Sequence, residues 1–285
     1  MMLSYDQAGD GPTVLLLHSG VCDRRMWDPQ CDDLIAAGYR VVRADFRGHG
    51  ETPADFTRPR RPFEDVRDLL DHLGIERAVL VGSSFGGRVA LETAARYPER
   101  VTALALLCPD VPGLEPGPAL RAFGAKEDEL LEAGDVDGAV ALNVDQWLGP
   151  EASAEVRTRV AEMQRHAFEV QLAAWALAQA AAAEEAGTEA PEPAEDATGA
   201  EGAAGAEGAE EPAEPALDLS RIQAPCLVVG GAHDVAEFRT AAAGLPGILP
   251  RARHVELAWA GHLPSLERPA ETAELLLGFL AEHRA

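Results

Sequence analysis

A serine between two glycines has the clearest chemical signature in the sequence. Ser84 is the centre of the pentapeptide GSSFG (residues 82–86), directly after the apolar run RAVLVG and before a helix-like stretch. A sharp turn from a strand into a helix exposes the serine hydroxyl at a helix N-terminus, which stabilises developing negative charge. The pattern therefore predicts a nucleophile at Ser84. The simpler alternative is an ordinary glycine/serine turn.

A histidine and two aspartates are the candidates for a general base and for the acid that orients it. His262 lies in AGHLP (residues 260–264), before the last helical stretch. We expect it to take the proton of Ser84 and return it to the leaving group. Asp234 follows the apolar run PCLVVG, and Asp110 follows the earlier run VTALALLC. Both aspartates are candidates for the acid, and each can equally be an ordinary surface-loop residue.

Buried strands that alternate with helices must position these residues. Strands are predicted at residues 13–18, 39–45, 77–82, 101–108, 225–230 and 254–259, with an edge strand at 3–7. Helices are predicted at residues 27–37, 62–73, 85–97 and 269–282. Continuous apolar runs are typical of parallel strands that are covered on both faces. The alternation thus predicts a doubly wound, mostly parallel α/β sheet.

The alternation stops between the two predicted halves of the sheet. Residues 120–183 have helical spacing in three segments, and residues 180–216 are rich in Ala, Glu, Gly and Pro. The second composition is typical of disorder, although an Ala/Glu helix can persist at its start. We therefore divide the chain into a first core part (1–110), a helical cap insertion (111–218) and a second core part (219–285).

With these motifs the sequence resembles the α/β-hydrolase family. The resemblance rests on GSSFG together with LHSG (residues 17–20), DFRGHG (45–50) and AGHLPSLERP (260–269). It implies an α/β-hydrolase fold with a helical cap and a triad in the chain order Ser, Asp, His, which Ser84, Asp234 and His262 satisfy. It also implies that DFRGHG is a structural turn beside the nucleophile.

The same resemblance implies an oxyanion hole made of backbone N–H groups. The expected donors are the N–H groups of Gly20 and Phe85. Ser19 stands where the family usually has glycine, so the N–H of Val21 is an alternative donor. His18 is expected to be a structural histidine that fixes this loop through its side chain.

Family chemistries that use an aspartate nucleophile do not fit this sequence. Epoxide hydrolases and haloalkane dehalogenases have aspartate at the position of Ser84, and epoxide opening also uses tyrosines of the cap. The tyrosines here are Tyr5, Tyr39 and Tyr97, all outside the insertion. We therefore expect a carboxylic ester or lactone hydrolase. The alternatives are a thioesterase, a C–C bond hydrolase, or a catalytically weak ligand-binding receptor of the same fold.

The predicted insertion offers large apolar side chains that suit a substrate pocket. The candidates are Trp147, Met163, Phe168 and Trp175. Packing between helices explains them equally well. The insertion has few cations to bind an anionic substrate, so we expect a small, neutral substrate.

Charge and cysteine pattern exclude several other classes. The formal net charge of −24 argues against nucleic-acid or anionic-membrane partners. The four cysteines (Cys22, Cys31, Cys108 and Cys226) form no CxxC pair, and we expect no metal site and no cofactor. The N-terminal residues lack the features of a signal peptide and no apolar run could span a membrane, so we expect a cytoplasmic protein. The sequence does not determine the oligomeric state.

Overall fold

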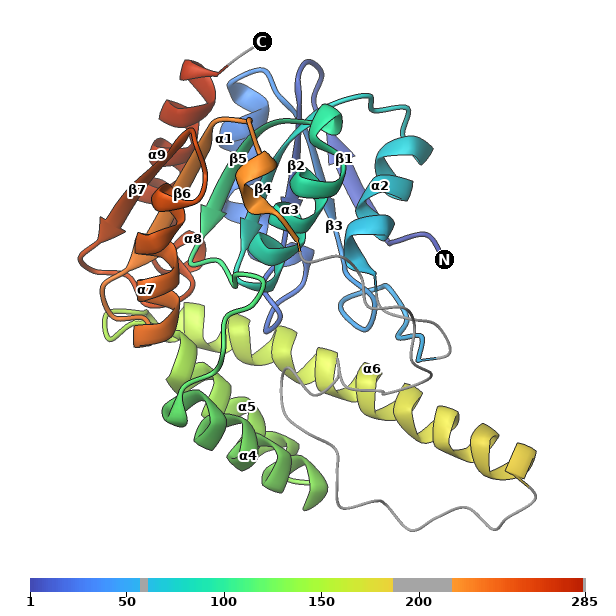
Figure 1. Cartoon of the computed structure of the whole chain (residues 1–285). Helices are drawn as coiled ribbons and strands as arrows, with labels where there is room; N and C mark the ends of the chain where they lie inside the picture. The colour runs from blue at the N-terminus through green and yellow to red at the C-terminus, as the bar shows by residue number, and fades with distance from the viewer. Residues whose placement is uncertain (57–60, 187–216, 284–285) are drawn as a thin grey trace.

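A mixed β-sheet forms the centre of the computed structural model, which describes residues 1–56, 61–186 and 217–283. Its strands are β1 (Tyr5–Ala8), β2 (Thr13–Leu17), β3 (Arg40–Ala44), β4 (Ala78–Ser83), β5 (Val101–Leu107), β6 (Cys226–Gly231) and β7 (Ala252–Leu257). Their order in the sheet is β1-β3-β2-β4-β5-β6-β7 (Figure 1). The edge strand β1 is antiparallel to β3, and the other pairs are parallel. The predicted mostly parallel sheet is confirmed.

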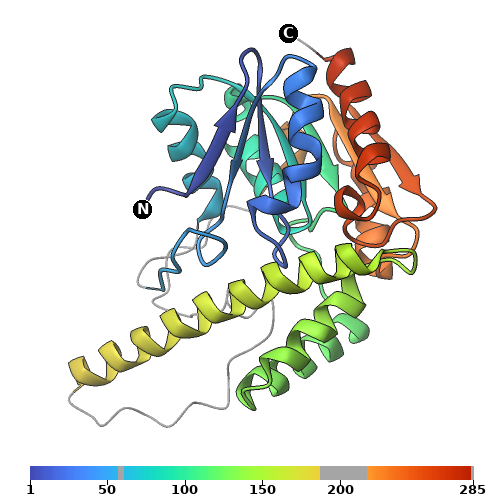
Figure 2. The same ribbon diagram turned by 180° about the vertical axis from the view of Figure 1, so that it is seen from behind.

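Helices cover both faces of the sheet. They are α1 (Asp28–Ala36), α2 (Pro62–His72), α3 (Phe85–Arg96), α7 (Ala236–Gly244), α8 (Pro264–Glu267) and α9 (Pro269–Glu282). Helices α1 and α9 cover the face seen in Figure 2, and α2 and α3 cover the other. Side chains alternate between the faces along each strand. Leu16 accordingly packs in one core cluster, whereas its neighbours Leu15 and Leu17 pack in the other.

Two predicted strands were misplaced, and both lie at an edge of the sheet. β7 is Ala252–Leu257 rather than 254–259, and β1 is Tyr5–Ala8 rather than 3–7. Edge strands bury less of their surface, and most residues of both are partly or fully exposed. Without a continuous apolar run, the sequence gives no sharp boundary. The central strands β2, β4, β5 and β6, in which all residues but Thr102 are buried, were predicted to within one or two residues.

Three helices form the insertion between β5 and β6. They are α4 (Pro118–Glu132), α5 (Val136–Trp147) and α6 (Ala154–Ala186), and they lie together across one end of the sheet. The three predicted helical segments are thus present. Of the tract predicted to be disordered, residues 180–186 form the end of α6, where a persisting helix was allowed for. The rest of that tract, 187–216, lies outside the described residues. Within the described ranges, no helix is both long and apolar enough to cross a bilayer.

Candidate active site

The turn between β4 and α3 places Ser84 at the end of a central strand. Its backbone has φ 51°, in the left-handed region that non-glycine residues rarely adopt. A Cβ added to Gly82 would lie 2.3 Å from the Gly86 carbonyl oxygen, and one added to Gly86 would lie 2.3 Å from the Leu17 carbonyl oxygen. Both positions therefore need glycine, because any side chain would clash with the neighbouring backbone. The strained turn is the geometry that the GSSFG pattern predicts for an exposed nucleophile.

Asp234 and His262 form a buried hydrogen-bonded pair. The imidazole Nδ1 lies 2.7 Å from Asp234 Oδ2, and each side chain is only 2 % exposed. The carboxylate accepts, so Nδ1 carries the proton and Nε2 is left as the basic nitrogen. Asp110, the alternative acid, instead pairs with Arg88 across 3.1 Å. The structure therefore brings Asp234, and not Asp110, to the imidazole.

The end of β5 connects the serine turn to the histidine loop. The Ser84 N–H donates to the Leu107 carbonyl oxygen (3.0 Å), and the adjacent Cys108 thiol contacts the Gly261 carbonyl oxygen (3.6 Å). Ser84 and His262 thus both lie at the carboxyl ends of the parallel strands. Between these two described side chains no hydrogen bond is present. Such contacts are often long until substrate binds, so the geometry remains compatible with proton transfer.

The predicted oxyanion donors lie next to each other. A Cβ added to Gly20 would be 3.8 Å from the Phe85 Cβ, so the loop after β2 contacts the first residue of α3. Within the described residues, the N–H groups of Gly20, Phe85 and Val21 make no hydrogen bond. The loop after β2 and the start of α3 therefore offer free donors. Val21 stays open as the alternative to Gly20.

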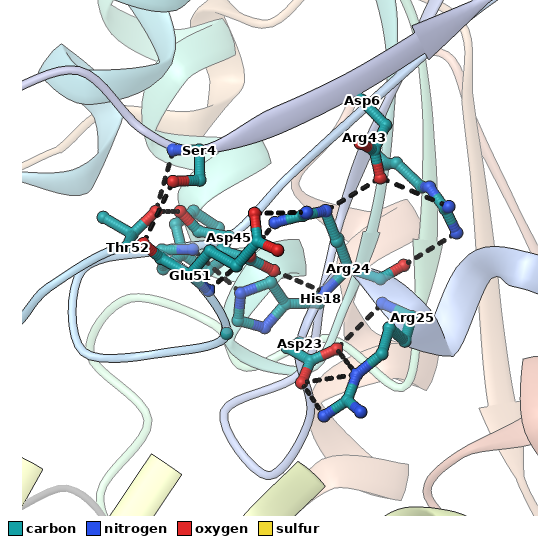
Figure 3. Close-up of polar contacts among 12 residues, drawn as sticks. Ser4, Asp6, His18, Asp23, Arg24, Arg25, Arg43, Asp45, Glu51 and Thr52 are labelled. Carbon is teal, nitrogen blue, oxygen red and sulfur yellow. Dashed lines mark hydrogen bonds and ion pairs between the residues drawn. The ribbon is translucent and has the colours of Figure 1, made fainter. Parts of the chain in front are cut away.

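His18 fixes this loop and has no nitrogen left for catalysis. Its Nδ1 lies 2.8 Å from the Ser19 carbonyl oxygen, and its Nε2 accepts a hydrogen bond from the Phe46 N–H at 2.9 Å (Figure 3). The ring is completely buried, and this desolvation lowers its pKa from 6.5 to about 4. A neutral ring that donates through Nδ1 satisfies both contacts, as expected for a structural histidine.

The DFRGHG turn contacts the same loop after β2. Asp45 accepts hydrogen bonds from the backbone N–H groups of Arg24 (2.8 Å) and Glu51 (2.9 Å), and it also binds the Arg24 guanidinium (Figure 3). The His49 Nε2 lies 2.9 Å from the Gly20 carbonyl oxygen. This turn is structural, as predicted, and it fixes one of the proposed oxyanion donors.

The four predicted pocket residues do not all lie at the histidine. The Trp147 ring lies 4.7 Å from the His262 ring, centroid to centroid, whereas Met163 and Phe168 are buried in the core cluster that includes Trp147. Trp175 is 37 % exposed and packs against Phe56 near the far end of α6. Only Trp147 is thus placed directly at the histidine.

Three residues that the sequence did not reveal surround the Asp234–His262 pair. The Phe238 ring, in the first turn of α7, lies 4.5 Å from the His262 ring. Glu267 binds the histidine loop through several backbone amides. Cys108 is fully buried behind the pair. Of these, only Glu267 lies within a motif already singled out, AGHLPSLERP, but nothing in that motif predicts its contacts.

Cys108, Asp234 and His262 are also the residue types that bind metal ions. Their ligand atoms all lie within 4.8 Å of one another. The 2.7 Å contact between His262 and Asp234 is a hydrogen bond, however, and leaves no space for an ion between them. Burial also raises the pKa of the Cys108 thiol well above its usual value, which disfavours the thiolate that a metal needs. The geometry fits a catalytic histidine–acid pair better than a metal site.

Comparison with known proteins gives one family and several named relatives. The model of the family described as alpha/beta hydrolase fold matches residues 12–269. The 2-hydroxy-6-oxo-6-phenylhexa-2,4-dienoate hydrolase of Comamonas testosteroni is 36 % identical over 114 residues, 38 % of this chain and 40 % of that protein. Bifunctional epoxide hydrolase 2 of Sus scrofa is 30 % identical over 154 residues, 50 % of this chain and 28 % of that protein. The matches thus span less than half the length of these relatives.

A solved structure matches over almost the full chain. The thermophilic esterase from Thermogutta terrifontis has a TM-score of 0.75 and 22 % identity, with 99 % of this chain and 94 % of that chain covered. At this identity the likeness shows the fold alone.

Proposed function

The chain belongs to the α/β-hydrolase fold family, and on that premise we propose that it is a serine hydrolase acting through an acyl-enzyme on Ser84. Its substrate in this proposal is a carboxylic ester or lactone of a small, neutral molecule. His262 removes the Ser84 proton as Oγ attacks the carbonyl carbon, and the N–H groups of Gly20 and Phe85 bind the oxyanion. His262 then protonates the leaving oxygen. Water, activated by His262, hydrolyses the acyl-enzyme and regenerates Ser84.

The buried Asp234–His262 hydrogen bond carries this proposal. It sits at the same sheet edge as a serine in a strained turn, and it fixes the tautomer in which Nε2 is the base. A surface His–Asp contact would have no such consequence. Here both side chains are shielded from water, so the imidazolium formed during proton transfer keeps its partner.

Pairing of the insertion's cations supports a neutral substrate. Its arginines and lysine are all engaged: Arg121 with the Pro116 carbonyl oxygen, Lys126 with Glu129, Arg157 with Asp145, Arg159 with Asp28, and Arg165 with Asp137. A carboxylate bound by one of these cations would compete with its present partner. The rings of Trp147 and Phe238 beside His262 instead suit an apolar acyl group.

A C–C bond hydrolase is the second candidate, because the Comamonas relative is named a dienoate hydrolase. That substrate is an anion, and the paired cations argue against it here. Epoxide hydrolysis, named for the porcine relative, is disfavoured by Ser84 and by the lack of tyrosine in the insertion.

Fluorophosphonate labelling with peptide mapping tests the nucleophile. We expect wild type to be labelled at Ser84, and Ser84→Ala to lose labelling and roughly 10⁴–10⁶ in kcat on activated esters. Ser83→Ala is the matched control. That hydroxyl is buried in the neighbouring position without a hydrogen-bond partner, so we expect at least about a tenth of the activity to remain. Equal turnover by wild type and Ser84→Ala would exclude the proposal.

A substrate panel separates the two candidate reactions. The panel is a series of p-nitrophenyl esters from acetate to laurate beside a vinylogous diketo acid. We expect the highest kcat/KM for short esters. Faster turnover of the diketo acid would favour the C–C hydrolase.

A further inference from the structure

Glu267 in α8 binds the backbone on both sides of His262. Its carboxylate oxygens accept hydrogen bonds from the N–H of Gly261 (2.9 Å) and the N–H of Leu263 (3.1 Å). A third donor is the N–H of Gly149, at 3.2 Å. Gly149 is not part of the core, because it lies in the connection between α5 and α6 of the insertion. One partly buried carboxylate therefore joins the histidine loop to the insertion.

The same connection, residues 147–149, contacts the histidine loop directly. The His262 N–H donates to the Trp147 carbonyl oxygen at 3.0 Å. A Cβ added to Gly149 would lie 2.7 Å from the Gly261 nitrogen, and one added to Gly261 would lie 2.3 Å from the Gly149 nitrogen. The two backbones are thus packed with no side chain between them. This close fit leaves no room for independent movement of the two segments.

The chemistry around Glu267 matches an ionised carboxylate. Each of its hydrogen-bond partners is a backbone N–H, and a charged carboxylate accepts from all of them. Burial raises the pKa of Glu267, while these amides and nearby His262 oppose that change. A protonated or amide side chain would instead present a donor to one of the N–H groups.

We propose that Glu267 is a positioning residue that clamps the His262 loop to residues 147–149, so that a shift of the helical insertion displaces the imidazole from Ser84. This rests on the proposed function. Glu267 does not contact the reacting atoms and acts through the backbone. The position of the insertion therefore controls proton transfer as well as access to the site.

Two substitutions of Glu267 separate the effect of its side-chain length from the effect of its charge. Glu267→Gln should lower kcat by about 10²-fold, the order expected for a catalytic group misplaced by about 1 Å. It also removes a negative charge near His262, so the acid limb of the kcat/KM profile should move to lower pH. Glu267→Asp keeps the charge but shortens the side chain, so kcat should fall without that movement of the acid limb.

Gly149→Ala tests the clamp from the insertion side without changing Glu267. Its new Cβ would lie 2.4 Å from Glu267 Oε2, so the connection must move off the loop. We expect kcat to fall at least about tenfold, with a smaller change in KM. Gly124→Ala in α4 is the matched control, because its Cβ meets nothing within 4 Å. Glu129→Gln in α4, which removes a carboxylate paired with Lys126, is the charge-neutralising control for Glu267→Gln.

The readouts are kcat, KM, the pH profile and the rate of fluorophosphonate labelling, with folding checked by circular dichroism. Slower labelling in Glu267→Gln and Gly149→Ala, but not in the controls, supports the clamp. Wild-type labelling rates and pH profiles in both folded variants would overturn it, as would equal losses in the controls. If Glu267→Gln fails to fold, Gly149→Ala decides. Failure of wild type itself to label at Ser84 would contradict the proposed function instead, so the two failures are distinguishable.

Discussion

The loops after β2 and β7 each contain a buried histidine, and they use it in opposite ways. In the first loop, both ring nitrogens of His18 bind the backbone, and burial keeps the ring neutral. In the second, Nδ1 of His262 is bound by the carboxylate of Asp234, and Nε2 has no hydrogen-bond partner among the described residues. The first ring is structural because no nitrogen is free. The second retains Nε2 for chemistry, because its other nitrogen meets an acid.

Partners, and not burial, therefore distinguish a structural histidine from a catalytic one. The two side chains are almost equally shielded from solvent, at 0 % and 2 % exposure. What differs is that the His18 ring itself binds the backbone of its loop and of Phe46, whereas the backbone around His262 is held by Glu267 and Trp147. His262 is thus oriented without the use of its second nitrogen. The comparison predicts that substitution of His262 lowers turnover far more than substitution of His18.

The largest expected effect is the loss of turnover in His262→Ala. Removal of the base should reduce kcat by roughly 10⁴–10⁶. It also leaves the buried Asp234 carboxylate without its partner, so stability falls as well. His18→Ala leaves the buried Phe46 N–H unsatisfied, which costs about 1–3 kcal/mol of stability, and should retain far more of the turnover than His262→Ala. Ester kinetics and urea unfolding of both variants measure the contrast, and a reversed pattern would exchange the two roles.

The next effect concerns the acid. Asp234→Asn should reduce kcat on the order of 10³–10⁴, because the amide no longer fixes the Nδ1–H tautomer. Asp110→Asn should change kcat less than about threefold, since it removes only a partly exposed ion pair with Arg88 worth under about 1 kcal/mol. Steady-state kinetics on one activated ester suffices. A larger loss in Asp110→Asn would move the acid to that loop.

The sequence predicted the three triad candidates better than the residues that surround them. Ser84 and Asp234 each follow a buried strand, and short motifs after such strands are visible because the strands are continuous apolar runs. His262 follows the more exposed edge strand β7, and it was identified from the AGHLP motif instead. Glu267 and Phe238 come close to His262 only through contacts between α7, α8 and the loop. No local pattern encodes such contacts. Trp175 was a pocket candidate because it is an aromatic residue of the insertion, but it packs against Phe56 and lies away from the histidine.

Acid titration of stability is the third effect and concerns the first loop. The folded chain holds the pKa of His18 at about 4, below the 6.5 of a free histidine. Between these values the unfolded chain binds a proton that the folded chain does not, so stability falls as pH falls. The slope is about 1.4 kcal/mol per pH unit, and the total is about 3 kcal/mol. Urea unfolding of wild type and His18→Asn from pH 7 to pH 4 measures it. An equal slope in both proteins would show that other groups cause the loss.

The smallest effect separates the two neighbours of the second loop, Cys108 and Glu267. Cys108 touches the Gly261 carbonyl oxygen at 3.6 Å, and burial keeps its thiol protonated by raising its pKa. A thiol is a weak donor, so its loss should cost at most about 0.5–1 kcal/mol, or a two- to fivefold fall in kcat. Cys108→Ala removes no charge, so the acid limb of kcat/KM should stay in place, unlike in Glu267→Gln. A hundredfold loss of kcat, or a shifted acid limb, would show that the thiol and not the carboxylate positions the Asp234–His262 pair.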